Sequence, residues 1–374
     1  MKKKILSVLL CAAMVTSMAV GCSSTSEETS GSEEQTETDA DSKDGTIYLL
    51  HKGLDYYAWT AMQEAFDKYV QDLGYDYQIL NAENDVSKQV EQFKTTLTQD
   101  PKAIIVTAID SESLVDCVKE ANDAGIPVGV YDTPITGGDV DITVDCDNKM
   151  AGQQAAEMIV EALKEKNGSE SGKVLNVFGD LSSQVMQERK QGFDDVMAQY
   201  PDIEVIEASG MGDRLESQDA TANALAANED IDAIHAPCDN AFNGVYEAVE
   251  SAGKLAKVGE EGHIIMVSID GEPTTLDRIT DDYMDGTVNL DWHAVAAICL
   301  EMMDKYVFTG EEMPDTYEAS DSYFEFDWDS TEIKEATDWN GPWISLPTHK
   351  VDKENAQDPN NSGRYSADVL GIDY

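Results

Sequence analysis

The chain alternates short apolar runs with longer amphipathic stretches from Thr46 to about Phe308. Runs such as Ala103 to Thr107 and Val128 to Tyr131 are almost wholly apolar, which is typical of strands buried on both faces of a parallel sheet. Segments between them, such as Val86 to Leu97, repeat apolar residues at the spacing of one helix face. This alternation predicts βαβ units, and therefore an α/β fold built on parallel sheets.

The same pattern predicts the extent of each element. We expect strands at Thr46–Leu50, Asp76–Leu80, Ala103–Thr107, Val128–Tyr131, Ile142–Val144, Lys173–Phe178, Ile203–Glu207, Asp232–His235, His263–Ile269, Thr287–Leu290 and Trp343–Thr348. We expect helices at Trp59–Leu73, Val86–Leu97, Ser111–Ala124, Asn148–Lys164, Val185–Gln199, Arg214–Ala227, Ala241–Ser251 and His293–Phe308. The acidic, aromatic segment from Met313 to Gly341 has no clear period and is left unassigned.

The stretch from Ala121 to Pro134 places a carboxylate where ligands are usually bound. Gly125 supplies the left-handed cap at the end of a helix, and Pro127 opens the next strand. Asp132 follows at the carboxyl end of that strand, the edge at which open α/β sheets bind ligands. The competing interpretation is a loop aspartate that caps a turn.

The first residues predict export. Three lysines precede an apolar run that ends at Val20 and is too short for a comfortable membrane span. Small residues then precede Cys22, which resembles a bacterial lipobox, so we expect residues 1–21 to be a lipoprotein signal peptide and Cys22 to carry lipid. An ordinary secretory signal is the alternative. The acidic, Ser/Thr-rich residues 22–44 predict a disordered tether that holds the folded part at the outer face of the bacterial cell membrane or in the periplasm.

The charge balance narrows the range of partners. The 374 residues carry a formal net charge of −49, which disfavours nucleic acid and anionic lipid head groups because both would be repelled. Neutral or cationic small ligands stay open. Cys117, Cys146, Cys238 and Cys299 lack the spacing of a metal site, so no metal is predicted, and their spacing establishes no disulfide.

No catalytic motif stands out in the sequence. The chain lacks a nucleophile elbow, an H-E-x-x-H sequence, a Walker lysine motif and a nucleotide-binding glycine fingerprint. We therefore expect a binding protein without a cofactor rather than an enzyme.

Polar and aromatic residues gather where the predicted strands end. Carboxylates and amides can hydrogen-bond vicinal hydroxyls, and aromatic faces can stack on sugar rings, so a neutral polyol is a natural partner. Each residue taken alone is at least as easily explained as a turn or helix cap. The set comprises Asp55, Tyr56, Tyr57 and Trp59 after the first strand, Asp132 after the fourth, Asp239 and Asn240 after His235, Asp270 after Ile269, and Asp291 after Leu290.

The order of these motifs resembles that of the type I periplasmic binding proteins of ABC sugar transporters, in the ribose- and galactose-binding group. The likeness runs from about Thr46 to Ala356, through stretches such as GIPVGVYDTP, DNKMAGQQAAEMI, QERKQGFDDVM, CDNAFNGVYEAVESAGK, VSIDGEP and DGTVNLD. It implies two Rossmann-like lobes with parallel sheets, joined by a three-crossover hinge, that close on a ligand.

The resemblance also implies where the lobes begin and end. The N-terminal lobe would comprise residues 45–146 and 291–314, and the C-terminal lobe residues 147–290 and 315–356. Residues 357–374 would form a polar tail. The chain would cross between the lobes near Cys146, near Leu290 and again around Met313 to Tyr317.

Residue roles are carried over from the family in the same way. Asp132 and Asp270 match hydroxyl-binding aspartates, and Arg189 matches an arginine that donates to ring or hydroxyl oxygens. The alternative for Arg189 is a salt bridge on a helix surface. The stacking aromatic of the first lobe is expected among Tyr56, Tyr57 and Trp59. The expected binding set is completed by Asp55, Cys238, Asp239 and Asp291.

Several contacts of that family are absent here. Cys238 stands where an asparagine is common, Gly212 where a second stacking aromatic is expected, and Thr133 where ribose binders often have an arginine. The sequence therefore leaves the sugar open. Trp292 and the Met313–Gly341 segment are candidates for replacement walls.

The resulting hypothesis is a monomeric, lipid-anchored binding protein that captures a monosaccharide or related polyol and delivers it to an ABC permease. Two alternatives stay open. One is a co-sensor that presents its ligand to a two-component or chemotaxis receptor, and the other is a secreted hydrolase on the same fold.

Overall fold

The computed structural model describes residues 43–374, which belong to one compact unit. The predicted signal peptide, Cys22 and most of the tether lie outside the described residues. Lys43 and Asp44, which we assigned to the tether, instead open the first strand, because Lys43 pairs with Tyr75 of the neighbouring strand. From residue 43 onward, no helix combines the length and apolar character that crossing a membrane requires.

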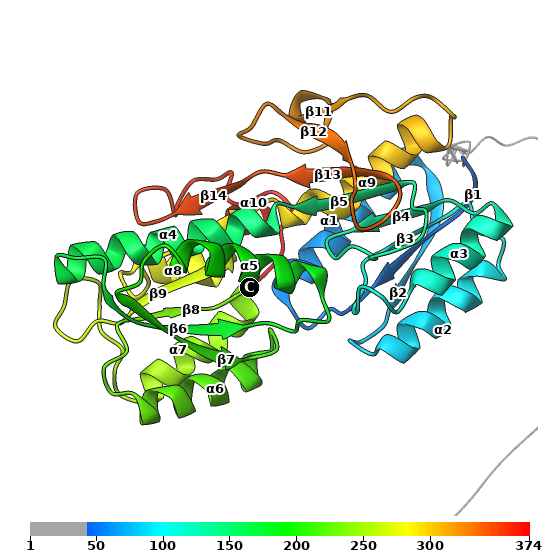
Figure 1. The fold of residues 1–374 in the computed structure, drawn as a ribbon. Helices are drawn as coiled ribbons and strands as arrows, with labels where there is room; N and C mark the ends of the chain where they lie inside the picture. Colours follow the sequence, from blue (N-terminus) through cyan, green and yellow to red (C-terminus); the bar gives the residue numbers. More distant parts are fainter. Residues whose placement is uncertain (1–42) are drawn as a thin grey trace, which may run out of the picture. The chain divides into compact units, whose positions relative to one another are not determined.

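Over this range the chain forms two sheets, each in its own lobe (Figure 1). The first sheet has the strand order β11-β12-β13-β5-β4-β3-β1-β2. Its strands are β1 (Lys43–His51), β2 (Tyr75–Asn81), β3 (Ala103–Val106), β4 (Val128–Tyr131), β5 (Ile142–Cys146), β11 (Thr316–Glu318), β12 (Ser330–Glu335) and β13 (Pro342–Leu346). The second sheet has the order β14-β10-β9-β8-β6-β7. Its strands are β6 (Gly172–Phe178), β7 (Ile203–Ser209), β8 (Ala233–His235), β9 (Ile265–Asp270), β10 (Gly286–Leu290) and β14 (Thr348–Val351).

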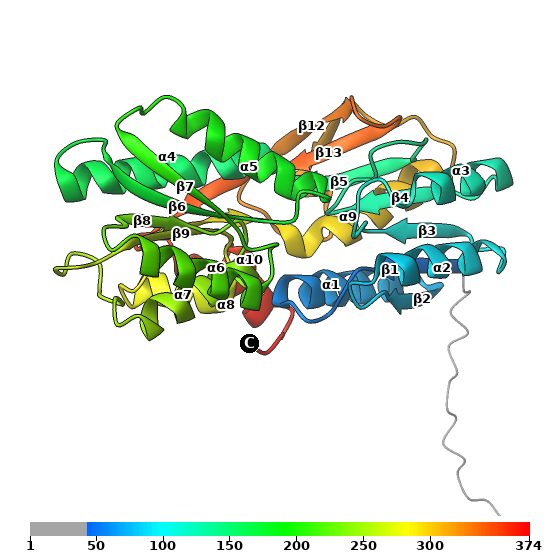
Figure 2. The ribbon, with the colours of Figure 1, turned by 60° about the horizontal axis from the view of Figure 1, so that its bottom comes forward.

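Helices cover both faces of each sheet. In the first lobe, one face is covered by α1 (Tyr57–Leu73) and α9 (Val295–Met302), and the other by α2 (Val86–Leu97) and α3 (Val115–Ala124). In the second lobe, α4 (Asn148–Asn167) and α5 (Gln184–Met197) lie on one side and α6 (Arg214–Ala227), α7 (Asp239–Ser251) and α8 (Pro273–Thr280) on the other, as Figure 2 shows. Shorter helices are η1 (Trp292–Ala294), η2 (Met303–Val307), η3 (Ala319–Asp321) and α10 (Ser362–Asp368).

The predicted α/β class with two sheet-based lobes is confirmed. Strands β1 to β5 pair in parallel with one another, as do β6 to β10. Helices carry the chain back between most of these strands, whereas β4 connects to β5 through residues 132–141 without a helix. Antiparallel strands enter only near the sheet margins of the described chain, where β12 pairs with β13 and β14 pairs with β10.

The chain passes between the lobes at three places. Two lie where we predicted them, after β5 and after β10. The third prediction, around Met313 to Tyr317, is wrong. Strand β13 still belongs to the first sheet, where Trp343 to Leu346 pair in parallel with β5, whereas β14 belongs to the second. The third passage is therefore the short link between Leu346 and Thr348.

Two lobe assignments are corrected for the same reason. Residues 315–346, which we assigned to the second lobe, extend the first sheet through β11, β12 and β13. The tail 357–374 is not merely a polar end, because it contains α10, whose Ser362 backbone N–H donates to Asn289 Oδ1 at 2.8 Å. Figure 1 places α10 where the two lobes meet.

Helices α4 and α5 approach each other at backbone contact. A methyl group placed on Gly152 would lie 2.0 Å from the Arg189 carbonyl oxygen, and one on Gly192 would lie 2.0 Å from the Lys149 carbonyl oxygen. Only glycine permits this spacing, because any side chain would push the helices apart. The glycine pair thereby sets the position of Arg189 in the second lobe.

Candidate functional site

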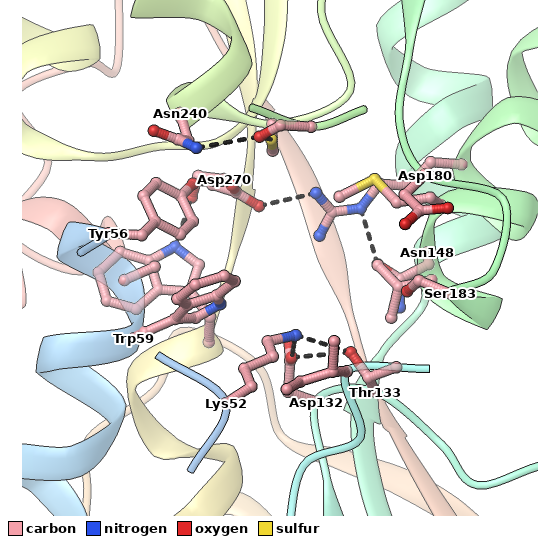
Figure 3. A pocket seen from close by; sticks show the side chains of 18 of the residues that line it. Lys52, Tyr56, Trp59, Asp132, Thr133, Asn148, Asp180, Ser183, Asn240 and Asp270 are labelled. Atoms are coloured by element: carbon pink, nitrogen blue, oxygen red, sulfur yellow. Dashed lines mark hydrogen bonds and ion pairs between the residues drawn. The ribbon is translucent and has the colours of Figure 1, made fainter. Parts of the chain in front are cut away.

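A cavity of about 310 Å³ lies between the lobes, at the carboxyl ends of β1, β4 and β9 (Figure 3). Its first-lobe lining includes Lys52, Asp55, Tyr56, Trp59, Asn84, Ile109, Asp132 and Thr133. Its second-lobe lining includes Asn148, Asp180, Ser183, Val185, Met186, Arg189, Met211, Gly212, Asp213, Cys238, Asn240 and Asp270. The lining is completed by Ala58 and Met62 of α1 and by residues beside the first two crossings, Cys146, Leu290, Trp292 and Val295.

In the first lobe, Asp132 is held by one of its two oxygens. Oδ2 accepts from Lys52 Nζ at 2.5 Å, from Thr133 Oγ1 at 3.0 Å and from Thr107 Oγ1 at 3.2 Å. Figure 3 shows Lys52 and Thr133 reaching Asp132 from either side. Oδ1 has no partner among residues 43–374 and is not sealed from solvent. Asp132 therefore offers one acceptor to a ligand.

In the second lobe, Arg189 of α5 is the central donor. Its Nε donates to Asn148 Oδ1 at 2.9 Å, and its Nη1 donates to the Pro237 carbonyl at 2.7 Å and lies 3.0 Å from Asp270 Oδ1. Nη2 has no partner within the described chain and keeps accessible surface. The guanidinium is thus fixed on three sides and leaves one nitrogen for a ligand oxygen.

Asp270, by contrast, is saturated by the protein. Its Oδ1 faces Arg189, while Oδ2 accepts from the Tyr56 hydroxyl and from the Asp239 backbone N–H at 3.3 Å. Tyr56 belongs to the first lobe and Asp270 to the second, so this contact links the lobes. Trp292 Nε1 donates to the Asp270 carbonyl at 2.8 Å and fixes the strand end.

Further contacts between the lobes show that the cleft is closed. The Ala58 backbone N–H donates to Glu272 Oε1 at 3.0 Å. At another point of the rim, the Ser111 N–H donates to the Ser182 carbonyl at 3.2 Å, and the Gln184 N–H donates to Ser111 Oγ at 3.0 Å. Each of these pairs joins a first-lobe residue to a second-lobe residue.

Backbone strain is concentrated at the cavity. Seven non-glycine residues of the described chain have positive φ, and four of them, Asn84, Asp132, Met211 and Asp270, line the cavity. Asp270 has φ of 120°, a conformation that L-residues rarely adopt. Such strain persists where the surroundings hold it, which is common at ligand sites.

The two cavity aspartates differ in their acidity. Burial opposes ionisation of Asp132, but the adjacent Lys52 ammonium outweighs it and lowers the pKa of this carboxyl below the ordinary value. Burial raises the pKa of Asp270, although Arg189 acts against the rise. Behind Asp270, burial followed by the charge of Asp270 raises the pKa of Asp239 to about 7. Burial and Asp239 raise the pKa of Glu272 well above its ordinary value.

Seven of the predicted binding residues line the cavity: Asp55, Tyr56, Trp59, Asp132, Arg189, Cys238 and Asp270. Three predicted residues lie elsewhere. Tyr57 points to the C-terminal segment, where its hydroxyl donates to the Ile372 carbonyl at 3.3 Å. Asp239 is buried behind the lining, accepting from the Ser268 hydroxyl and, at 2.7 Å, from the Glu272 N–H. Asp291 accepts from Trp328 Nε1 at 2.8 Å.

These three residues follow their strands, but their side chains turn into the protein, where neighbouring donors satisfy the two aspartates and a backbone carbonyl accepts from Tyr57. Trp292 lines the cavity as a wall, as we expected, whereas the Met313–Gly341 segment contributes nothing to the lining among the described residues. The segment lies behind the lining, where Trp328 donates to Asp291 and Phe324 and Phe326 pack on His293.

Sequence reasoning missed Lys52 and Asn148 as lining residues. Lys52 immediately follows β1, so its position at a strand end was a usable signal. Asn148 opens α4 and bridges Arg189 to the Cys146 carbonyl, which its Nδ2 reaches at 2.8 Å. A helix-opening asparagine normally suggests a cap, so no local pattern distinguishes this role.

The site offers unpaired donors and acceptors beside aromatic rings. Tyr56 and Trp59 pack edge to face with centroids 5.4 Å apart. The four described cysteines are free and buried. No group of three or more His, Cys, Asp or Glu side chains suited to a metal ion occurs among residues 43–374. The arrangement can therefore hold a hydroxylated ring by hydrogen bonds and apolar contact.

Comparison with known proteins agrees with this geometry. A family model described as a periplasmic binding protein domain matches residues 47–312. The chain is 26% identical over 272 residues to the ribose import binding protein of Escherichia coli strain K12, which covers 73% of this chain and 88% of that protein. It is 26% identical over 276 residues to the D-allose-binding periplasmic protein of the same strain, covering 71% and 86%.

Solved structures share the fold. A galactofuranose binding protein superposes with a TM-score of 0.72 at 20% identity, covering 88% of this chain and all (100%) of that chain. A solute binding protein of Bacillus halodurans C-125 with bound myo-inositol gives a TM-score of 0.69 at 23% identity, covering 86% and 99%. With the matched domain spanning most of the chain and both lobes present, the chain belongs to the periplasmic binding protein domain family.

Proposed function

We propose that this protein is an extracytoplasmic solute-binding protein that captures a monosaccharide or related polyol between its lobes and delivers it to an ABC permease. The single observation that carries the proposal is the closed cavity in which Asp132 Oδ1 and Arg189 Nη2 stay unpaired within the described chain. A hydroxyl group can donate to the first and accept from the second, so a polyol satisfies both.

The charges in the cavity favour a ligand without an acidic group. Lys52 and Arg189 supply positive charge, and each is already paired with a carboxylate. An anionic ligand would have to compete with Asp132 and Asp270 for these partners, at the cost of leaving a buried carboxylate unpaired. A neutral sugar keeps both pairs intact and adds hydrogen bonds to them.

Specific roles follow for the lining residues. Asp132 accepts from a ligand hydroxyl, Arg189 donates to a ligand oxygen, and Trp59 offers a ring for the apolar face of a sugar. Asp270 and Tyr56 act mainly to hold the lobes together over the ligand. Asp55, at the exposed edge of the cavity, is engaged by Asn84 Nδ2 at 3.0 Å and contributes to its mouth.

The partners and location belong to the same proposal. Related proteins that are named as import binding proteins support an ABC permease as the receiver, and a monomer suffices because both walls of the cavity come from one chain. The periplasmic binding protein family implies a location outside the cytoplasm. Lipid anchoring through Cys22 explains how such a protein would stay at the cell surface, and it rests on the local sequence pattern alone.

A thermal-shift screen of residues 43–374 tests the proposal. The panel holds pentoses, hexoses, deoxysugars, inositols, small oligosaccharides and nucleosides. A ligand at about 100 times its Kd should stabilise the protein by roughly 2.7 kcal/mol. Asp132→Asn is the matched variant, because it keeps the size of the side chain and should lose most of the shift.

The outcomes separate the competing functions. A sugar or inositol that stabilises the protein and is recovered unchanged after prolonged incubation supports a binding protein. Conversion of that ligand would indicate a hydrolase. A response confined to nucleosides or to another class would reject the sugar assignment while retaining a binding role.

A further inference from the structure

Part of the second-lobe side of the cavity is formed by sulphur-bearing side chains and a glycine, next to polar lining residues such as Asp213 and Asn240. We use the term sulphur wall for Met186, Met211, Gly212 and Cys238, all of which line the cavity from the second lobe. None of these four offers a charged or strongly hydrogen-bonding side chain, since a thioether and a thiol are weak partners. The first-lobe lining includes the charged and aromatic side chains of Lys52, Asp132 and Trp59.

The backbone of the sulphur wall is firmly held. The Gly212 carbonyl accepts from Asn240 Nδ2 at 3.0 Å, and Cys238 Sγ lies 3.7 Å from the same oxygen. The Gly210 N–H donates to the Phe178 carbonyl at 2.9 Å. Met211 and Gly212 both have left-handed φ values, 54° and 69°. The loop therefore presents a fixed surface from which no side chain extends at position 212.

Met186 fills its place for a structural reason. A methyl group on Gly179 would lie 2.4 Å from the Met186 sulphur, so the glycine leaves room for this side chain. A methyl group on Gly212 would meet Met186 Cε at 3.6 Å and Cys238 Sγ at 4.0 Å, which are ordinary contact distances. Within residues 43–374, no nitrogen or oxygen atom outside the immediate chain lies within 4 Å of that methyl position, so the two neighbours of the open side of Gly212 are sulphur-bearing side chains.

The Cys238 thiol belongs to this apolar surface. Cys238 is buried, and burial, followed by the charge of Asp270, raises the pKa of its thiol to about 12. The thiol is therefore uncharged at neutral pH. A ligand hydroxyl placed against it would exchange its hydrogen bonds to water for a weak sulphur contact, which is unfavourable.

We propose that the sulphur wall selects ligands that present an apolar edge to the second lobe, such as a deoxysugar methyl or methylene group or an O-methyl substituent. The inference rests on the proposed function, because it assumes a polyol whose other hydroxyls meet Asp132 and Arg189. Replacing a hydroxyl by hydrogen at this edge removes a desolvation cost. One such group in an apolar pocket changes affinity by about 10- to 200-fold.

Titration calorimetry with matched sugar pairs tests the inference. The pairs are D-galactose with D-fucose, D-glucose with 6-deoxy-D-glucose, L-mannose with L-rhamnose, and myo-inositol with its mono-O-methyl ethers. We expect at least one pair in which the deoxy or methylated member binds ten times more tightly or better. Equal or tighter binding of the parent in every pair that binds would overturn the inference and leave the proposed function standing. Failure of all these compounds, and of the wider sugar panel, would overturn both.

Substitutions in the wall provide the second test. Met186→Gln and Cys238→Asn add hydrogen-bonding groups at the wall, so each should shift the preference toward the fully hydroxylated member by about tenfold. Met186→Leu keeps the wall apolar and should keep the preference. If Cys238→Asn fails to fold, Met186→Gln still tests the inference, because Met186 is only half-buried. An unchanged ligand preference in Met186→Gln would contradict the inference.

Two control variants lie outside the cavity. Met150→Gln changes an exposed methionine at the start of α4, and Cys117→Ser changes a buried thiol in α3. Both should leave the ratio of affinities within each sugar pair unchanged, even where Cys117→Ser lowers thermal stability. A change in that ratio in either control would show that selectivity does not reside in the sulphur wall.

Discussion

Asp132 and Asp270 face one cavity from opposite lobes and differ in what they leave free. Both have left-handed backbone conformations, and both are paired with one cation. Asp132 concentrates its protein contacts on one oxygen, whereas Asp270 commits both oxygens, one to Arg189 and the other to Tyr56 and a backbone N–H. Asp132 therefore keeps one carboxylate oxygen available to a ligand, whereas Asp270 uses both of its oxygens in contacts that hold the cleft closed.

The difference also shows in acidity. The pKa of Asp132 is lowered, because Lys52 outweighs burial, while burial raises the pKa of Asp270. An ionised, half-satisfied carboxylate is a strong acceptor for a ligand hydroxyl. A carboxylate enclosed by protein donors serves structure better than recognition, although both would be identified as ligand groups from their positions at strand ends.

The largest effect is expected from Arg189→Ala, which removes the cation that is paired with Asp270 in the second lobe. Removing the guanidinium takes the cation away from the buried Asp270 carboxylate and leaves Asp270 Oδ1 and Asn148 Oδ1 without their donor, so the free energy of unfolding should fall by about 3–5 kcal/mol. Ligand binding should be lost as well. Chemical denaturation and calorimetry measure the two effects, and a fully stable variant would contradict the buried role of this arginine.

Asp132→Asn tests the role of the first-lobe carboxylate. The variant removes a charged acceptor, which should weaken binding of a polyol by about 10- to 100-fold. Because the folded-state pKa of Asp132 is lowered, the stability that it contributes is present above the ordinary value and is lost as pH falls through the folded value. The stability deficit of Asp132→Asn at pH 7 should therefore shrink in strong acid. A deficit that is constant with pH would exclude the Lys52 pairing as its cause.

The carboxyls behind Asp270 should give the protein an opposite pH dependence. The pKa of Asp239 is raised to about 7, so the folded state binds more protons than the unfolded state between the ordinary value and pH 7. Stability should consequently decrease as pH rises through that window. Denaturation at pH 5, 6, 7 and 8 should show this slope in the parent protein and a shallower one in Asp239→Asn. Equal slopes would assign the pH dependence to other groups.

Tyr56→Phe is the smallest and most selective change. It removes the hydroxyl that joins the first lobe to Asp270 and keeps the ring that packs on Trp59. One such hydrogen bond is worth about 0.5–1.5 kcal/mol, so affinity should fall by roughly 3- to 10-fold through faster dissociation. Stopped-flow measurements separate the association rate from the dissociation rate. A decrease in the association rate alone would argue against the idea that the Tyr56–Asp270 hydrogen bond holds the lobes closed over the ligand.

The regular α/β core could be predicted from the sequence because its elements carry their own patterns. The boundaries of α2, β4 and α6 are those expected from apolar spacing and from glycine and proline positions. Their side chains face a sheet on one side or two, so hydrophobic periodicity reports their structure directly.

Elements at the margins could not be found in this way. Strand β12 is mostly exposed and exists because β13 lies beside it, so the pairing rather than its own pattern determines it. Helix α10 packs through small groups: a methyl on Gly363 would lie 2.4 Å from the Gly271 carbonyl oxygen. Close backbone packing of Ser and Gly leaves no apolar period to detect.

The same limit applies to the site. Strand ends identified Asp132 and Asp270, since every parallel strand delivers its last residues to one edge. They also identified Asp291 and Asp239, whose side chains turn inward to donors supplied by distant residues. Sequence position predicts where a backbone arrives, and the direction of a short side chain depends on partners that are remote in the chain.

The backbone contact between α4 and α5 has a consequence for how variants of this protein will be interpreted. Gly152 and Gly192 do not belong to the lining of the cavity between the lobes, yet a single added methyl group at either would displace the helix that carries Arg189. A genetic selection for loss of uptake would accordingly recover substitutions at these two glycines. A map of such variants would show that function is sensitive to substitutions where α4 crosses α5. A prediction based only on distance from the cavity would wrongly class substitutions at both glycines as neutral.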